Sequence, residues 1–135
     1  MIKKTKLVFI SCVSLMVSGC GLCGQNITTT SIYKDENKAI VTLIKDCGAT
    51  TVPTGTFYLI PLESLDEIKP ESPKIKKKYK LLSEERGVFE FNWISKEDLE
   101  VVYNFPVHGG RQGAFDFQAS HVDGVNITYR QKVRY

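Results

Sequence analysis

Cysteine and histidine carry the most reactive side chains of this 135-residue chain. The residues in question are Cys12, Cys20, Cys23, Cys47, His108 and His121. A thiolate beside a histidine can act as a nucleophile, and histidine with aspartate can bind a metal ion. None of the spacings matches a compact metal motif such as H-E-x-x-H or paired C-x-x-C. We therefore expect no metal site, no cofactor and no catalytic residues. A thiol- or metal-dependent enzyme using Cys47 with His108 or His121 is the alternative.

The first twenty residues have the pattern of an export signal. Three lysines among the first six residues precede the apolar run LVFISCVSLMV at 7–17. This run is long enough for a secretory signal and shorter than the roughly 20 residues of a spanning helix. It ends in VSGC at 17–20, which resembles the bacterial lipobox. The resemblance implies that residues 1–19 are removed and that Cys20 becomes the lipidated first residue, carrying palmitate-type acyl chains. An ordinary exported protein with a chance cysteine here is the alternative.

Removal of the signal changes the cysteine count. Cys12 leaves with it and Cys20 is used for lipidation, so Cys23 and Cys47 are left. In an oxidising compartment two cysteines in a small domain predict one disulfide. Closing that loop of about 25 residues stabilises the fold by roughly 3 kcal/mol in the chain-entropy model. The alternative is a reactive Cys47 thiol, which needs a nearby base and partial exposure.

The charge of the mature chain is close to zero. Three of the 18 basic side chains lie in the signal, which leaves 15 against 15 acidic ones. A near-neutral exported domain gives no reason to expect a nucleic-acid partner.

Short segments rich in β-branched and aromatic residues dominate the rest of the chain. They lie at 39–45, 56–60, 88–94, 99–105, 114–118 and 125–133. Val88, Glu90 and Asn92 alternate with Phe89, Phe91 and Trp93, which predicts one wet and one buried face. Short turn-forming links favour antiparallel neighbours. We expect a mainly β fold, either a single antiparallel meander sheet or a sandwich, of about six strands with one long loop.

The predicted organisation is a lipidated tether at 20–30 followed by a single β domain at 31–135. Within that domain, 62–86 reads as a charged loop insertion, with a short helix possible at 62–68 after Pro61. From Lys74 to Lys80, five lysines in seven residues could touch anionic lipid headgroups. Because acidic residues flank this run on both sides, a solvated loop is the favoured interpretation.

The stretch KDCGATT at 45–51 carries a family resemblance, together with CGLCG at 20–24, NWISKEDLEVVYNF at 92–105 and VNITYRQKV at 125–133. These motifs resemble a family of small bacterial envelope proteins of unknown function. In that family D-C-G-A-T-T follows the first strand, and a Trp-containing hairpin precedes a C-terminal Tyr-Arg strand. This chain departs from the family in having YKDEN at 33–37 where Pro-Asp-Gly-Lys is usual, and in its lysine-rich insertion.

The D-C-G-A-T-T motif has a structural and a functional interpretation. As a strand exit, Asp46 accepts backbone N–H groups, Gly48 permits a positive φ, and Cys47 joins Cys23. As a recognition loop, Asp46, Thr50 and Thr51 would face a ligand. The structural interpretation is favoured, and both stay open at the level of sequence.

The sequence thus favours a non-enzymatic binding or accessory module of the cell envelope, anchored in the membrane through lipid on Cys20. An envelope protein or a cell-wall component is the expected partner. With two membranes the anchor would lie in the outer membrane facing the periplasm, and with one membrane on the outer face of the plasma membrane.

Overall fold

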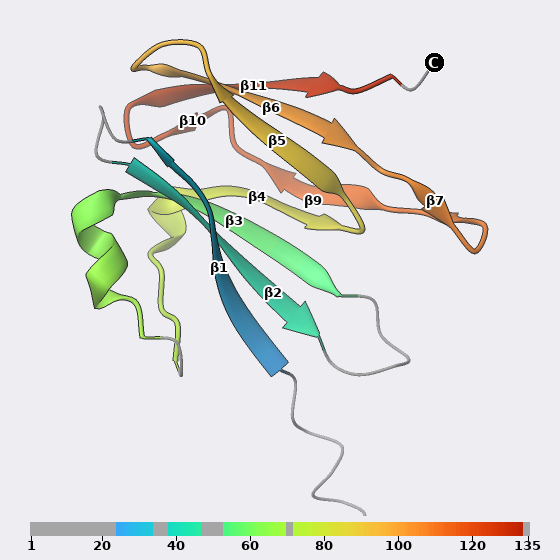
Figure 1. Ribbon diagram of the computed structural model, residues 1–135, viewed down its shortest axis with the longest axis horizontal. Coiled ribbons are helices and arrows are strands. Elements are labelled where there is room, and N and C mark those ends of the chain that lie inside the picture. Colours follow the sequence, from blue (N-terminus) through green and yellow to red (C-terminus); the bar gives the residue numbers. More distant parts are fainter. Residues whose placement is uncertain (1–23, 34–37, 47–52, 70–71, 134–135) are drawn as a thin grey trace, which may run out of the picture.

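The protein is a sandwich of two β-sheets packed face to face (Figure 1). The computed structural model describes residues 24–33, 38–46, 53–69 and 72–133, and, in β1 and at His108, the backbone only. The predicted mainly β class is confirmed, in its sandwich form. All six predicted strands are present.

The larger sheet has five antiparallel strands in the order β1-β2-β3-β4-β9. Its strands are β1 (Gly24–Tyr33), β2 (Lys38–Asp46), β3 (Thr54–Pro61), β4 (Lys80–Glu85) and β9 (Ala114–Gln118). The 3-10 helices η1 (Leu62–Glu67) and η2 (Lys77–Tyr79) connect β3 with β4. The expected short helix after Pro61 is therefore a 3-10 helix.

The smaller sheet has four strands in the order β10-β11-β6-β5. Its strands are β5 (Val88–Trp93), β6 (Asp98–Asn104), β10 (His121–Val122) and β11 (Val125–Gln131). A separate hairpin, β7 (Val107–His108) with β8 (Arg111–Gln112), projects beyond the sandwich (Figure 1). β6 and β11 run parallel, because the chain between them crosses to the larger sheet to form β9 before it returns. The fold is therefore no simple meander.

The expectation of a charged loop at 62–86 is wrong for β4. This strand lies inside the larger sheet, between β3 and β9. Leu81 and Leu82 are both fully buried in the core, although consecutive strand residues normally face opposite sides. A register shift opposite Phe57 and Tyr58 breaks the alternation and turns both leucines inward. In the sequence, two adjacent leucines in a lysine-rich segment do not show the alternation of apolar and polar residues that indicates a strand.

The expected tether at 20–30 also differs from the structure, because Gly24–Tyr33 forms β1 and pairs with β2 along its length. β1 is polar, with the sequence GQNITTTSIY, and therefore lacks the apolar alternation that marks a half-buried strand. Backbone hydrogen bonds to β2 hold β1 in the sheet, and backbone pairing of this kind does not depend on the side-chain pattern of β1.

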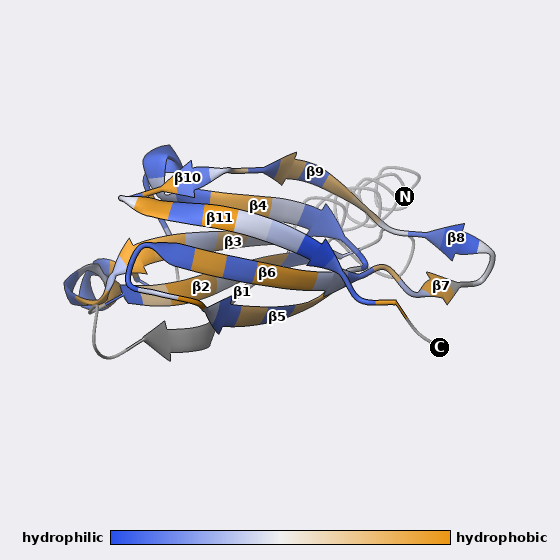
Figure 2. Ribbon diagram, turned by 90° about the horizontal axis from the view of Figure 1, so that it is seen from above, coloured by the Kyte–Doolittle hydropathy of each residue, from blue (hydrophilic) through white to orange (hydrophobic). Residues whose placement is uncertain are grey.

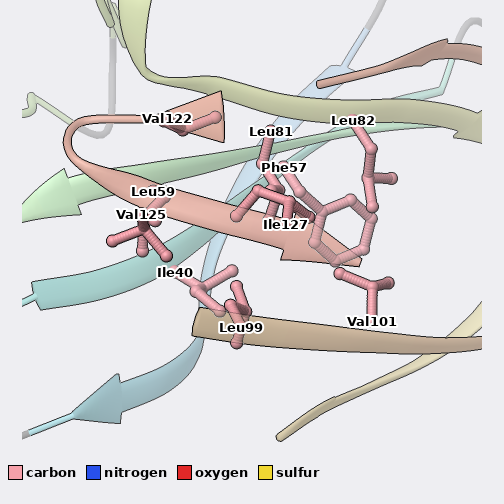
Figure 3. Close-up of a cluster of buried hydrophobic side chains, with 10 residues drawn as sticks. All are labelled: Ile40, Phe57, Leu59, Leu81, Leu82, Leu99, Val101, Val122, Val125 and Ile127. Carbon is pink, nitrogen blue, oxygen red and sulfur yellow. The ribbon is translucent and has the colours of Figure 1, made fainter. Parts of the chain in front are cut away.

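The main core lies between the two sheets. Figure 3 shows its ten buried side chains converging from both layers: Ile40, Phe57, Leu59, Leu81, Leu82, Leu99, Val101, Val122, Val125 and Ile127. Phe89, Phe91 and Trp93 of β5 pack against this cluster, which confirms the predicted buried face of that strand. Hydrophobic and hydrophilic residues alternate along β5 and β6 in Figure 2.

A second, smaller core lies on the outer face of the larger sheet. Ala39, Val41 and Ile60 are buried there beneath apolar residues of η1 and of the segment that leads to η2. The covering residues are Leu62, Leu65, Ile68, Ile75 and Tyr79, with Tyr58 beside them. Within the described part of the chain, this cover lies on the outer face of the larger sheet.

Tyr129 of β11 ties the two layers together through its hydroxyl group. The hydroxyl donates to the carbonyl oxygen of Ala119 at 2.8 Å, in the segment that links β9 to β10. Burial raises the pKa of Tyr129 to about 12, so the phenol is neutral and available as a donor at physiological pH. The Tyr129 ring contacts Phe115 of the opposite sheet at 5.7 Å between centroids.

Candidate functional site

The structure locates only part of the predicted site. Asp46 is the last residue of β2 and its side chain is exposed. Five predicted site residues lie outside the described residues: Cys20, Cys23, Cys47, Thr50 and Thr51. Lipidation, the disulfide and the recognition loop therefore stay predictions.

The histidines do not assemble a metal centre in the described part of the chain. His121 is exposed on β10, with Nδ1 at 3.2 Å from Oδ1 of Asn126. Asp123, two residues on, binds Lys38 Nζ at 2.8 Å. His108 lies in β7, and its side chain is outside the described residues. No group of three or more His, Cys, Asp or Glu suited to a metal ion occurs among the residues described.

Glu84 is the buried charged side chain of the described core, with 8% of its surface exposed. It lies at the end of β4, where Oε2 accepts the backbone N–H of Gly87 at 2.6 Å and closes the turn into β5. Gly55 faces it on β3, and a Cβ at that position would lie 2.5 Å from Oε1. Burial raises the pKa of the Glu84 carboxyl, partly offset by the Gly87 hydrogen bond. Asp116 and Glu85 raise the pKa of Glu84 further.

We expect Glu84→Gln to remove a pH dependence from folding stability. Because the folded-state pKa of Glu84 is raised, the folded protein holds this proton more tightly than the unfolded chain. The resulting stabilisation is complete below the ordinary value of 4.5 and is lost as pH rises through the folded-state pKa. Glutamine keeps an oxygen that accepts the Gly87 N–H. Urea unfolding over a pH series should show the stability of the wild type falling relative to that of Glu84→Gln as pH rises through the folded-state pKa of Glu84.

Glu84→Ala serves as the control for the hydrogen bond. It leaves the Gly87 N–H without its acceptor, which costs about 1–3 kcal/mol at every pH. Equal pH slopes in the wild type and Glu84→Gln would contradict a raised pKa at Glu84.

The outer face of the smaller sheet carries an ordered set of polar side chains, which we call the polar face. It comprises Glu90, Asn92, Asp98, Glu100, Asn126, Thr128, Arg130 and Lys132. These residues alternate with the core-facing residues of β5, β6 and β11. The two 3-10 helices pack on the other sheet, and most of the polar face is exposed to solvent.

Glu100 is the centre of the polar face. Its Oε1 accepts from Arg130 Nη2 of β11 at 3.2 Å and from Asn92 Nδ2 of β5 at 3.4 Å. These two hydrogen bonds lower the pKa of the Glu100 carboxyl, that from Arg130 being the larger cause. Three strands are thereby linked through one carboxylate.

Asp98 organises one end of the same face. Its carboxylate accepts from Ser95 Oγ at 2.7 Å and from Asn126 Nδ2 at 3.2 Å, and both hydrogen bonds lower its pKa. Asn126 also contacts His121 through its amide oxygen. The Asp98 contacts extend the network to β10.

Lys132 and Glu90 close the opposite end. Lys132 Nζ lies 3.1 Å from Glu90 Oε1. The pair reaches across β6 and covers Val102, whose surface is only 3% exposed. A hollow of about 100 Å³ opens beside the pair, lined by Val88, Glu90, Val102, Tyr103, Asn104 and Lys132. The pair is well exposed, so it orders the surface rather than stabilising the fold.

A second hollow of about 100 Å³ lies beneath the lysine run on the larger sheet. It is lined by Ile60, Ser64, Glu67, Ile68, Lys74, Ile75, Lys76 and Tyr79. Two lysines of the run rest on aromatic rings: Lys78 Nζ lies 4.9 Å from the centroid of Tyr79 and Lys80 Nζ 4.7 Å from that of Phe117. Both hollows are small beside typical small-molecule pockets of roughly 300–1,000 Å³.

Sequence reasoning missed the polar face as a candidate site. The sequence did contain one indication of it: the alternation along β5 places Glu90 and Asn92 on the solvent-exposed side of that strand. Their partners come from β6 and from the distant β11, and sequence spacing does not reveal a parallel pairing across 28 residues between Asp98 and Asn126.

The chain was compared with protein-family models, curated proteins and solved structures, and none of them matches it. In the described part of the chain, no helix has the length and hydropathy needed to span a membrane.

Proposed function

We propose that this protein is a lipid-anchored, non-enzymatic binding or accessory module of the bacterial cell envelope, and that its polar face recognises a protein or cell-wall partner. The observation that carries the proposal is the hydrogen-bonded network centred on Glu100. Side chains that hold one another in place lose little conformational entropy on binding. The network thus presents a preorganised set of donors and acceptors.

The shape of the surface favours a large partner. A small-molecule site is usually a concave, largely apolar pocket. The polar face is instead a broad sheet surface, and the hollow beside Lys132 holds only about 100 Å³. Protein interfaces commonly combine such polar contacts with a few exposed apolar anchors. Val88, with 57% of its surface exposed, lies at the border of the polar face and could serve as one.

Location in the envelope rests on the lipobox-like VSGC at 17–20. The sandwich begins at Gly24, four residues after Cys20, so a lipid on that cysteine would hold β1 close to the membrane. Partners attached to the same membrane or to the wall would then be within reach.

The proposed disulfide between Cys23 and Cys47 is supported by the adjacent strand register. Gly24 pairs with Asp46 at this end of β1 and β2. Cys23 and Cys47, which lie outside the described residues, are the chain neighbours of this pair, so a disulfide between them would start from a strand end where the two segments already meet.

We expect Cys47→Ser to lower the free energy of unfolding by roughly 3 kcal/mol. The physical reason is the larger conformational freedom of the unfolded chain without the cross-link. Denaturant unfolding measures the loss, and maleimide labelling should modify the wild type only after reduction while labelling Cys23 in the variant directly. A wild-type Cys47 thiol that reacts without reductant would contradict the disulfide and favour the thiol-enzyme alternative.

Site-specific photo-crosslinking tests the binding function. A benzophenone amino acid replaces Thr128, which is exposed on the polar face, in the full chain expressed in cells. The matched control carries it at Ser72, which is exposed outside the polar face. We expect a discrete adduct with an envelope component from position 128 and none from position 72. An absence of adducts at 128, or the same adducts from both positions, would contradict the proposal.

Charge reversal at the centre of the network provides a second measurement. Arg130→Glu places a carboxylate beside Glu100 and breaks the ordered array, while Arg130 is an exposed residue whose loss leaves the core intact. The adduct from position 128 should then fall at least tenfold with little change in melting temperature.

A further inference from the structure

Among the described strands, β5 is an edge strand of the smaller sheet, and its single charged residue is Glu90. Its sequence VFEFNW contains no Pro, Lys or Arg, and its register with β6 has no bulge. The other three edges of the two sheets differ: β1 and β9 pair through register shifts, and β10 has two residues. Flat, unprotected edges pair readily with a further strand.

The backbone groups of β5 that face this edge can be assigned. The N–H of Ile94 donates to the carbonyl oxygen of Asp98 at 2.9 Å, so Ile94 turns its backbone toward β6. In an antiparallel ladder the backbone groups alternate in direction from residue to residue. Val88, Glu90 and Asn92 therefore also turn toward β6, and the N–H and C=O groups of Phe89 and Phe91 turn toward the open edge.

Two exposed apolar side chains flank the same edge. Val88 at the start of β5 is 57% exposed, and Ile94 immediately after the strand is 66% exposed. Between them lie Glu90 and Asn92, an acceptor and a donor of hydrogen bonds. The order along the edge is thus apolar, acidic, amide, apolar.

We propose that β5 pairs with β5 of a second copy of this chain, antiparallel and across a two-fold axis at Phe91. This register places Glu90 opposite Asn92 of the partner subunit and Val88 opposite Ile94 of the partner subunit. The backbone groups of Phe91 meet those of the same residue in the second copy. Each polar side chain then faces a polar one and each exposed apolar side chain faces an apolar one.

The neighbouring two-fold register that centres on Glu90 is less favourable. It would place the two Glu90 carboxylates directly opposite each other, which destabilises a strand pair. It would also leave Ile94 without an apolar partner. The register centred on Phe91 avoids both defects and keeps Lys132 beside Glu90, where it lies in the single chain at 3.1 Å.

Pairing at β5 would join the two four-stranded sheets into one continuous sheet, with two polar faces side by side on one surface. The isologous contact is the commonest form of homodimer symmetry. The dimer goes beyond the proposed function and does not depend on it, because it is formed by the backbone edge of β5; of the polar face, only Glu90 and Asn92 take part in it.

Two double variants of the full chain in mild detergent test the dimer. Val88→Lys with Ile94→Lys places lysines opposite each other twice across the axis, whereas Val88→Lys with Ile94→Glu places lysine opposite glutamate. Both pairs of changes are at exposed positions, so circular dichroism and melting temperature should stay close to those of the wild type. Sedimentation analysis should give at least a tenfold weaker dimer for the lysine pair than for the lysine-glutamate pair. A monomeric wild type at about 50 μM, or equal dimer affinities of the two variants, would overturn the proposal.

Cysteine cross-linking tests the register. Opposed residues of a non-hydrogen-bonded pair have Cα atoms about 4.5 Å apart, which suits a disulfide. Mixing Glu90→Cys with Asn92→Cys should give a 90–92 heterodisulfide under mild oxidation, identified by mass spectrometry of the peptides. A 90–90 disulfide forming equally well in Glu90→Cys alone would overturn the register centred on Phe91.

Discussion

Leu82→Ala is expected to lower the free energy of unfolding by about 2–5 kcal/mol, the usual cost of emptying a core leucine site. Leu82 has no exposed surface and lies between the sheets with Phe57 and Val101 (Figure 3). The surrounding side chains come from strands of both sheets and can close only part of the cavity. Urea unfolding followed by Trp93 fluorescence or circular dichroism measures the loss.

The matched control for Leu82 is Lys77→Ala in the same segment. Lys77 is exposed, and such a surface substitution should change the free energy of unfolding by no more than about 0.5 kcal/mol. If residues 62–86 were a loop throughout, both substitutions would have small effects. A loss below about 1 kcal/mol for Leu82→Ala would contradict the buried position of β4.

Cys20→Ser is expected to abolish acylation of the protein. Without the thiol no diacylglyceryl group can be added, so the lipid anchor is lost. Cys20 precedes the first described strand, β1, so the fold of the described residues should be unaffected. Membrane fractionation and intact-mass analysis measure the result: the wild type should be acylated and pelleted with membranes, and the variant unacylated.

Cys23→Ser is the control for Cys20→Ser. It removes a neighbouring thiol and the proposed disulfide but leaves the lipobox-like sequence unchanged, so the protein should stay acylated and membrane-bound. An acylated Cys20→Ser variant, or wild-type protein with an intact and unmodified N-terminus, would contradict the lipid anchor.

Strands with strong alternation could be predicted from the sequence. Phe89, Phe91 and Trp93 alternate with polar residues and do pack on the core, and the predicted segment 114–118 coincides with β9. In such strands the local pattern and the global fold agree. The class of the fold follows from them.

Elements without a periodic signal could not be predicted. β4 contributes two adjacent buried leucines because a register shift breaks its alternation, and β1 pairs along β2 with a largely polar sequence. Their placement depends on neighbouring strands that lie elsewhere in the chain. Tertiary pairing of this kind overrides local propensity.

The candidate site divides in the same way. The lipobox-like motif and the two remaining cysteines are local features, and the sequence predicts their chemistry without a fold. The network around Glu100 needs β6 to lie between β5 and β11, and Arg130 is 30 residues away. Only the strand order brings these side chains together.

The central position of β11 has a consequence for how the molecule is made. β11 is the last of the described strands along the chain, yet it lies inside the smaller sheet between β10 and β6. During synthesis or export, β6 therefore stays unpaired on one side until residues 125–131 have emerged. Contacts of such long sequence separation form slowly and leave a partly assembled intermediate open to aggregation or degradation. A nonsense mutation before Val125 would thus deprive Leu99 and Val101 of their neighbouring strand and yield a chain that quality-control proteases remove.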